Sequence, residues 1–198
     1  MLTDAYGNQL TTSTGLARDN YDIGLRAFLS ANYGSQEAFS QAIEADPNFA
    51  LAYVGLARSL ISSGKISEAK NSLEKSMKFV GNATDREKSH FLCVELALSG
   101  SSKKARDAVN KHVSIWPRDA LIAQMNTSVF GLIGFSGEAS REWDLLEYTE
   151  KLLPHYDNDW WMMSMHAISL CETGQTFKSM ELMEKALNLN PRNANAAH

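Results

Sequence analysis

The chain has 198 residues, of which 44% are hydrophobic, and its formal net charge at pH 7 is −4. This composition is too apolar for a disordered chain, and the weak negative charge gives no general attraction to nucleic acid or to anionic membranes. The two cysteines, Cys93 and Cys171, are too few for a disulfide framework, so we expect two buried, reduced thiols.

Residues 1–15 are expected to form an N-terminal extension. They lack a basic stretch followed by an apolar run, so the sequence predicts no signal peptide. No apolar segment approaches the roughly 20 residues that a membrane crossing needs. We therefore expect a cytoplasmic protein with no membrane partner.

From residue 16 onward, the apolar spacing predicts alternating first and second helices, and no stretch alternates with the period of a strand. The first helices are expected at 16–32, 49–63, 84–99, 119–134 and 159–173. The second helices are expected at 35–45, 66–80, 102–115, 138–153 and 177–189. Thr84 and Glu87 predict a capping box, and each first helix but the first should end at a glycine: Gly64, Gly100, Gly134 and Gly174.

Proline marks a repeat of roughly 36 residues, the range typical of helical repeats. The residues that mark the repeat are Pro47, Pro117, Pro154 and Pro191. Gly81 stands where the same spacing would place a further proline. The spacing divides the chain into five helix pairs at 16–47, 48–81, 84–117, 119–154 and 159–191. Residues 192–198 then open an incomplete sixth repeat.

Inside the units, small residues such as Ala69 and Ala105 recur where two helices must approach closely. With the closing proline, this pattern resembles the tetratricopeptide repeat. The resemblance implies an all-α fold, a right-handed α-solenoid of about five stacked antiparallel helix pairs with a concave inner face.

The whole chain also resembles the first half of the tetratricopeptide repeat protein 38 family. The residues that carry the resemblance are Leu10–Thr14, Asp46–Ala52, Thr84–Glu87 with His90, Trp116–Asp119 and Leu189–Pro191. This resemblance implies a helical-repeat scaffold with no attached reaction. Because relatives continue through further helices, we expect the chain to be part of a longer protein.

In tetratricopeptide repeats, fixed positions of the first helices line a partner-binding groove. Here those positions are largely apolar and lack the Lys and Asn pair with which chaperone-binding relatives hold a peptide carboxylate. The sequence therefore predicts a noncatalytic scaffold whose apolar groove binds a protein or peptide, as a helix or an extended segment. The predicted groove residues are Leu51, Val54, Arg58, Ile61, Glu87, His90, Val94, Leu98, Trp161 and Ile168. Further helices of the same polypeptide could equally fill this groove.

The last helix is too apolar for contact with one neighbour. Its predicted self-association face consists of Met180, Met183 and Leu187. Since a solenoid needs a polar terminal cap, we expect a second copy or further C-terminal sequence to cover this face. A structural self-association module is therefore one alternative function.

The other alternative is an enzyme or metal-binding protein completed by absent C-terminal helices, with Glu87, His90 and His198 contributing. The five histidines lie in different units without metal-ligand spacing, so we expect neither a metal nor another cofactor. Charge is uneven: residues 65–118 carry 11 basic and 6 acidic groups, whereas residues 138–159 carry 2 basic and 7 acidic groups. We interpret both as solvated surfaces, and without interleaved aromatic residues the basic segment does not indicate RNA binding.

Overall fold

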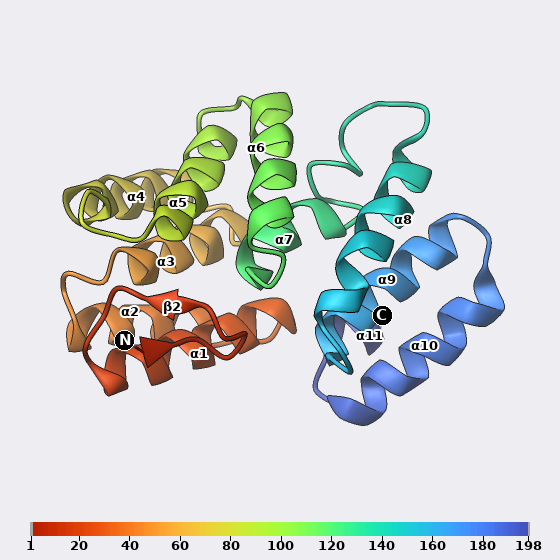
Figure 1. Cartoon of the computed structure of the whole chain (residues 1–198), viewed down its shortest axis with the longest axis horizontal. Coiled ribbons are helices and arrows are strands. Elements are labelled where there is room, and N and C mark those ends of the chain that lie inside the picture. Colours follow the sequence, from red (N-terminus) through yellow and green to blue (C-terminus); the bar gives the residue numbers. More distant parts are fainter. Residues whose placement is uncertain (1, 198) are drawn as a thin grey trace.

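The computed structural model describes residues 2–197, which form five consecutive helix pairs (Figure 1). The first helices of the pairs are α1 (Gly15–Leu29), α3 (Ala50–Ser62), α5 (Asp85–Leu98), α7 (Ala120–Thr127) and α9 (Trp160–Glu172). The second helices are α2 (Ser35–Ala45), α4 (Ile66–Val80), α6 (Ser102–Ile115), α8 (Arg141–Leu152) and α10 (Thr176–Leu189). The remaining elements are strands β1 (Leu2–Thr3) and β2 (Gln9–Leu10), the 3-10 helix η1 (Leu153–His155) and the short helix α11 (Ala194–Ala197). The predicted all-α solenoid is confirmed.

Local signals in the sequence set most helix ends. Thr84 and Glu87 form the predicted capping box at the start of α5, and Asp159 accepts a hydrogen bond from the Met162 amide at the start of α9. Three of the four predicted terminal glycines adopt positive φ angles after their helices, as the left-handed cap requires: Gly64, Gly100 and Gly174.

The closing prolines set the phase of the repeat. Helices α3, α7 and α11 each begin three residues after a proline, namely Pro47, Pro117 and Pro191. Because the proline ring cannot continue the preceding helix, the chain turns there and a new first helix starts in the same register. Helix α11 thus holds the same position relative to its proline as α3 and α7 do.

The fourth pair departs from the predicted pattern. The sequence predicts first and second helices over 119–134 and 138–153, whereas α7 ends at Thr127 and α8 begins only at Arg141. The prediction of a long first helix was wrong. An irregular loop, residues 128–140, takes the place of its second half.

Close backbone packing accounts for this loop. The Leu132 amide donates to the Met125 carbonyl at 2.8 Å, so the chain folds back over the end of α7. A Cβ at Gly131 would lie 2.6 Å from the same carbonyl oxygen, and one at Gly134 would lie 2.0 Å from the Val129 carbonyl oxygen. Gly134 thus allows two backbone segments of the loop to approach closely. It does not form the predicted helix cap.

Although no strand was predicted, the N-terminal extension contains a two-stranded antiparallel hairpin, in which Leu2 pairs with Leu10. The Asp4 carboxylate accepts from the Tyr6 and Asn8 amides, and Gly7 takes a φ of 82°. Two residues per strand are too few to show an alternating pattern, which is why periodicity missed this hairpin.

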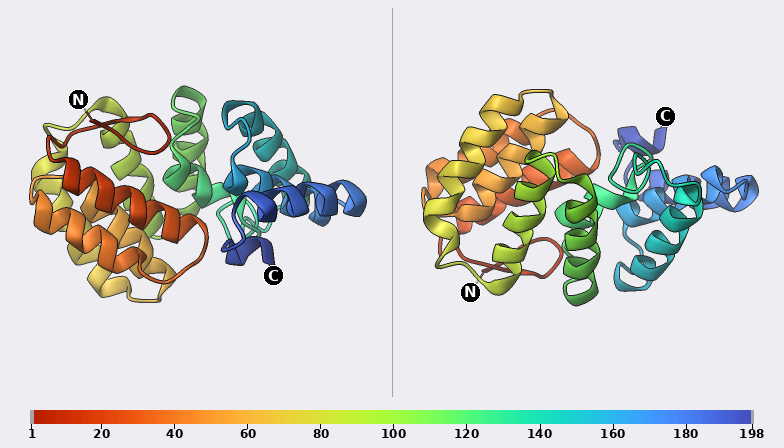
Figure 2. Two further views of the ribbon diagram at one scale, coloured as in Figure 1. Left: turned by 90° about the horizontal axis from the view of Figure 1, so that it is seen from below. Right: turned by 90° about the horizontal axis from the view of Figure 1, so that it is seen from above.

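The two ends of the solenoid are in contact. The inner face is therefore not an open groove, contrary to the prediction. The Ala194 amide donates to the Ser30 carbonyl at 3.0 Å, and Asn195 donates to the Leu29 carbonyl at 3.0 Å. Arg26 of α1 also lies over the Trp160 ring of α9, 5.5 Å from its centroid. Figure 2 shows the C-terminal end beside the first units while α10 projects from one end of the molecule.

Two smaller points complete the fold. Cys93 is buried as predicted, but Cys171 is exposed because it lies on the solvent side of α9. Within residues 2–197, none of the helices combines the length and the apolar character that a membrane crossing requires.

Candidate functional site

The structure places most of the predicted groove residues in the interior. The side chains of Leu51, Val54, Arg58, Glu87, His90, Val94 and Trp161 are buried. Only Ile61, Leu98 and Ile168 keep partial exposure, and they too pack against the core. The ten residues therefore lie on the inner sides of the first helices, as predicted, but they do not form an open groove.

The N-terminal segment, defined here as residues 2–14, covers part of this inner face. The Thr11 amide donates to Glu87 Oε1 at 2.8 Å, and the Tyr6 ring packs edge-on against Trp161 with centroids 6.5 Å apart. Leu10 is fully buried in the core. The sequence marked this segment only as an extension and did not predict these contacts.

Arg58 is the one groove cation that the fold encloses. Its guanidinium donates to Gln124 and lies over the Phe28 ring, 5.2 Å from the centroid. Burial lowers the pKa of Arg58 to about 10, which leaves it charged at neutral pH. These contacts use Arg58 to join units one, two and four rather than to hold a ligand.

A buried carboxylate, Asp119, is contacted by three polar side chains of the third unit. Arg86 donates to its Oδ2, and His90 Nδ1 and His112 Nε2 lie 2.9 and 3.1 Å from the same oxygen. Burial raises the pKa of Asp119, but the neighbouring His90 and Arg86 outweigh it and hold the pKa well below its usual value. The ionised carboxylate thus ties α5 and α6 to the start of α7.

His90, a candidate metal ligand in the enzyme alternative, belongs to this cluster. Burial lowers the pKa of His90, so the neutral ring donates from Nδ1 and leaves a buried Nε2 without a partner. Glu87 instead accepts from Thr84 and Thr11, and His198 lies outside the described residues. In the described part of the chain, no three His, Cys, Asp or Glu side chains are arranged to hold a metal ion.

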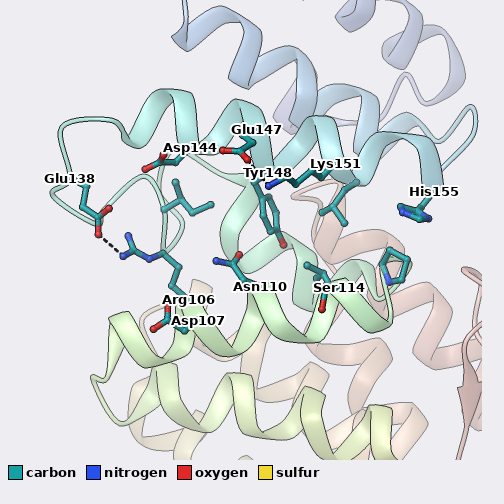
Figure 3. Close-up of a pocket in the computed structure, with 14 residues that line it drawn as sticks. Arg106, Asp107, Asn110, Ser114, Glu138, Asp144, Glu147, Tyr148, Lys151 and His155 are labelled. Carbon is teal, nitrogen blue, oxygen red and sulfur yellow. Dashed lines mark hydrogen bonds and ion pairs between the residues drawn. The ribbon is translucent and has the colours of Figure 1, made fainter.

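An accessible site lies elsewhere, between the second helices α6 and α8. The α6–α8 groove has a volume of about 620 Å³ (Figure 3). Its apolar floor consists of Val113, Pro117, Ile133, Tyr148 and Leu152. The Tyr148 hydroxyl donates to the Ala123 carbonyl at 3.1 Å, which fixes the ring against α7.

Charged side chains from both helices form the rim of the α6–α8 groove. In Figure 3, Arg106 reaches from α6 to Glu138 of the 128–140 loop. Lys151 donates to Glu147 one turn earlier on α8 at 2.5 Å. Arg106 and Lys151, the two cations of the rim, are both engaged in these ion pairs. Two further carboxylates of the rim, Asp107 and Asp144, have no ion-pair partner among the described residues. The rim is therefore net acidic.

Sequence reasoning missed this groove, although two of its signals were visible. The acidic excess of residues 138–159 was interpreted as a solvated surface, and it includes Glu138, Asp144 and Glu147 of the rim. The second signal was the fourth unit, in which the groove positions of the first helix could not be assigned from the sequence. Neither showed that α6 and α8 would stand apart with apolar residues between them.

The predicted self-association residues lie on α10, whose main contacts are with α9. Met180 is exposed, and Met183 and Leu187 are half-buried. The neighbouring Phe177 is 91% exposed, which is unusual for so large an apolar side chain. This helix thus presents an uncovered apolar stripe.

Comparison with known proteins identifies the repeat. Residues 50–79 match the family model described as a tetratricopeptide repeat. Curated proteins yield no match. The chain is also similar to several solved structures at low sequence identity.

Three of those structures illustrate the similarity. The Cut9-Hcn1 complex of the APC/C aligns with a TM-score of 0.52 and 14% identity over 91% of this chain, which spans 34% of that chain. YrrB, described as a TPR protein with an unusual peptide-binding site, aligns with a TM-score of 0.47 and 16% identity over 92% of this chain and 90% of its own. MamA aligns with a TM-score of 0.40 and 17% identity over 90% of this chain and 94% of its own.

Proposed function

We propose that the protein is a noncatalytic scaffold for protein–protein interaction and that a partner helix binds in the α6–α8 groove. The observation that carries this proposal is an apolar floor between two helices, bordered by carboxylates without an ion-pair partner among residues 2–197. A third helix can pack its apolar side chains between two others, as in other helix-in-groove complexes. The tetratricopeptide repeat at 50–79 supports an interaction role in general.

The charge of the rim specifies the partner further. Asp107 and Asp144 favour lysine or arginine beside the apolar stripe of the partner helix, because opposite charges at an interface rim steer association and set specificity. A helix with leucines at i, i+3 and i+4 and basic residues on both flanks fits this description.

A binding assay with designed peptides tests the proposal. Two amphipathic helical peptides share the same leucines but carry either lysine or glutamate on the flanks, and fluorescence anisotropy measures the Kd. We expect the lysine peptide to bind and the double variant Asp107→Lys/Asp144→Lys to weaken it by about tenfold at low salt. Glu150→Lys, on the exposed surface of α8 outside the groove, is the matched control. Equal affinity for both peptides and all variants would exclude this groove as the recognition surface.

The uncovered stripe of α10 supports self-association as a second candidate function. Because Phe177 and Met180 are exposed beside half-buried Met183 and Leu187, a second copy of α10 could cover all four. Sedimentation of Met180→Glu against Lys185→Glu, an exposed substitution on the same helix, tests this. Loss of a dimer only in Met180→Glu would support it, and a monomeric wild type at high concentration would eliminate it.

The resemblance to the tetratricopeptide repeat protein 38 family and the cytoplasmic location stay predictions from the sequence. The same holds for the exclusion of nucleic acid as a partner.

A further inference from the structure

The N-terminal segment is held as a bound peptide would be. Side chains of the solenoid bind its main chain: Arg86 donates to the Gln9 carbonyl at 2.9 Å, and Arg118 donates to the Tyr6 carbonyl at 2.8 Å. Glu87 accepts from the Thr11 amide at 2.8 Å. Main-chain contacts of this kind do not depend on which side chains the segment carries.

Two apolar anchors, four residues apart, add side-chain recognition. Tyr6 packs edge-on against Tyr156 and Trp161, with ring centroids 5.7 and 6.5 Å away. Leu10 is 0% exposed and is the most deeply buried residue of the segment. An aromatic residue and a leucine in separate apolar surroundings resemble the anchors of a peptide in its groove.

The contacts of the segment reach units that are far apart in the sequence. Glu87 and Arg86 belong to the third unit, Arg118 precedes the fourth, and Trp161 starts the fifth. The segment also contacts the first unit: the Ala5 amide donates to Asp22 of α1 at 2.9 Å, and the Thr12 hydroxyl donates to Asp46 at 2.5 Å. Later units therefore supply part of the surface that holds the segment, in addition to the first unit.

The hairpin within the segment also has its own internal order. Asp4 accepts from the main-chain amides of Tyr6 and Asn8 and from the Asn8 side chain at 3.0–3.2 Å. The turn is thus maintained by residues of the segment itself. These bonds join residues of the segment to one another and do not involve the inner face.

From these observations we propose that the inner face is a binding site for a turn-containing segment of this pattern, occupied in cis by residues 4–12. When the cis segment leaves, the site accepts the N-terminal segment of a second copy of the chain. The ligand class is a peptide that forms this turn and carries an aromatic residue, a leucine four positions later and a following threonine. Glu87, a predicted groove residue, binds the main chain, and Trp161 binds the aromatic ring.

A peptide that copies residues 2–14 is the probe for this site. In the full chain, Leu10→Asp places a charge in the apolar position of Leu10 and releases the cis segment, whereas Gln9→Asp adds the same charge at an exposed position. We expect Leu10→Asp to bind the labelled peptide at least about tenfold more tightly than wild type or Gln9→Asp, since the competing cis segment is gone. A peptide with aspartate in place of its leucine should not bind.

Folding of the variant is checked by circular dichroism and a cooperative thermal transition. A folded Leu10→Asp variant that does not bind the peptide more tightly than wild type would overturn the proposal. Should the variant not fold, hydrogen exchange of the wild type decides. The Asn8 and Thr11 amides must then exchange faster than the amides inside α5, because the segment opens on its own. Exchange of these amides only through global unfolding would show that the segment is a permanent part of the core.

Discussion

At the scale of single residues, one buried carboxylate organises the third and fourth units. Asp119 accepts from Arg86, His90 and His112, and each donor comes from a different turn of α5 or α6. A buried charge is costly unless it is fully paired, so removal of one member leaves the others unsatisfied. Asp119→Asn is accordingly expected to cost about 3–5 kcal/mol of unfolding free energy, because Arg86 would stay buried without its counter-charge.

The same cluster predicts how stability depends on pH. Burial lowers the pKa of His90, so the folded state keeps this ring neutral while the unfolded chain takes up a proton below about pH 6.5. The unfolded state then binds more protons, and the unfolding free energy falls as the pH falls. Asp119, whose pKa is also lowered in the fold, adds to the loss below about pH 4. Urea midpoints measured from pH 7.5 to pH 4 check the direction.

Two variants separate the contribution of His90. His90→Gln should flatten the slope between pH 7.5 and pH 5, although some slope remains because burial also lowers the pKa of His166. Ser114→Ala changes an exposed residue without a titratable group and should leave the slope as in wild type. An unchanged slope in His90→Gln would contradict this account.

At the scale of elements, the first three helices pack around a single aromatic ring. Phe39 of α2 is fully buried between Gly24 of α1 and Gly55 of α3. A Cβ at Gly24 would lie 2.9 Å from the ring, and one at Gly55 would lie 2.5 Å from it. Glycine in mid-helix normally weakens a helix, and here it is required because the helices approach through the ring.

This packing reverses the usual effect of a glycine-to-alanine substitution. In an exposed helix the change would stabilise by up to about 1 kcal/mol, but Gly55→Ala should destabilise by about 1–3 kcal/mol because it overpacks the ring. Thermal or urea unfolding measures the difference. Gly81→Ala, where nothing lies within 4 Å of the added Cβ, should be neutral or slightly stabilising.

A double variant tests the cause. If the clash with the ring is responsible, Phe39→Leu should relieve part of the cost of Gly55→Ala, so that the two effects are not additive. Strict additivity would indicate that Gly55 matters for another reason.

At the scale of the whole molecule, contact between the ends gives the solenoid its closed form. Asn32 donates to the Arg192 carbonyl at 2.5 Å and Asn195 to the Leu29 carbonyl at 3.0 Å. Open repeat arrays gain stability only from neighbours in sequence, whereas these bonds join the first unit to residues 192–195 at the other end of the array. The closure also places Trp160 and Trp161 beside the N-terminal segment.

Removal of both side-chain bonds should loosen the closure without unfolding the units. In Asn32→Ala/Asn195→Ala, we expect hydrogen exchange near α11 and at residues 29–32 to accelerate by about tenfold, since each bond contributes about 0.5–1.5 kcal/mol. Exchange in α3 and α4 should not change. Asn71→Ala, an exposed substitution on α4, is the control, and equal exchange in all three proteins would show that the ends do not meet in solution.

The sequence by itself determined the helix pairs, their phase and their caps, because these depend on local chemistry. A proline ring cannot continue the helix that precedes it, and the capping box of Thr84 and Glu87 is complete within four residues. The pattern of small and large side chains on a helix face decides which face packs against the neighbouring helix. The resemblance to the tetratricopeptide repeat implied that Glu87, His90 and Trp161 face inward, and all three are buried.

Only the tertiary structure decided which surfaces are open. The inner face is accessible only if residues 2–14 do not cover it and the ends do not meet. Both depend on contacts between distant residues, such as Thr11 and Glu87, which are 76 residues apart. The α6–α8 groove likewise arises because the chain folds back after Thr127, which shortens α7. Such contacts join distant segments, and the sequence of neither segment indicates which other segment it will contact. Local patterns therefore cannot predict them.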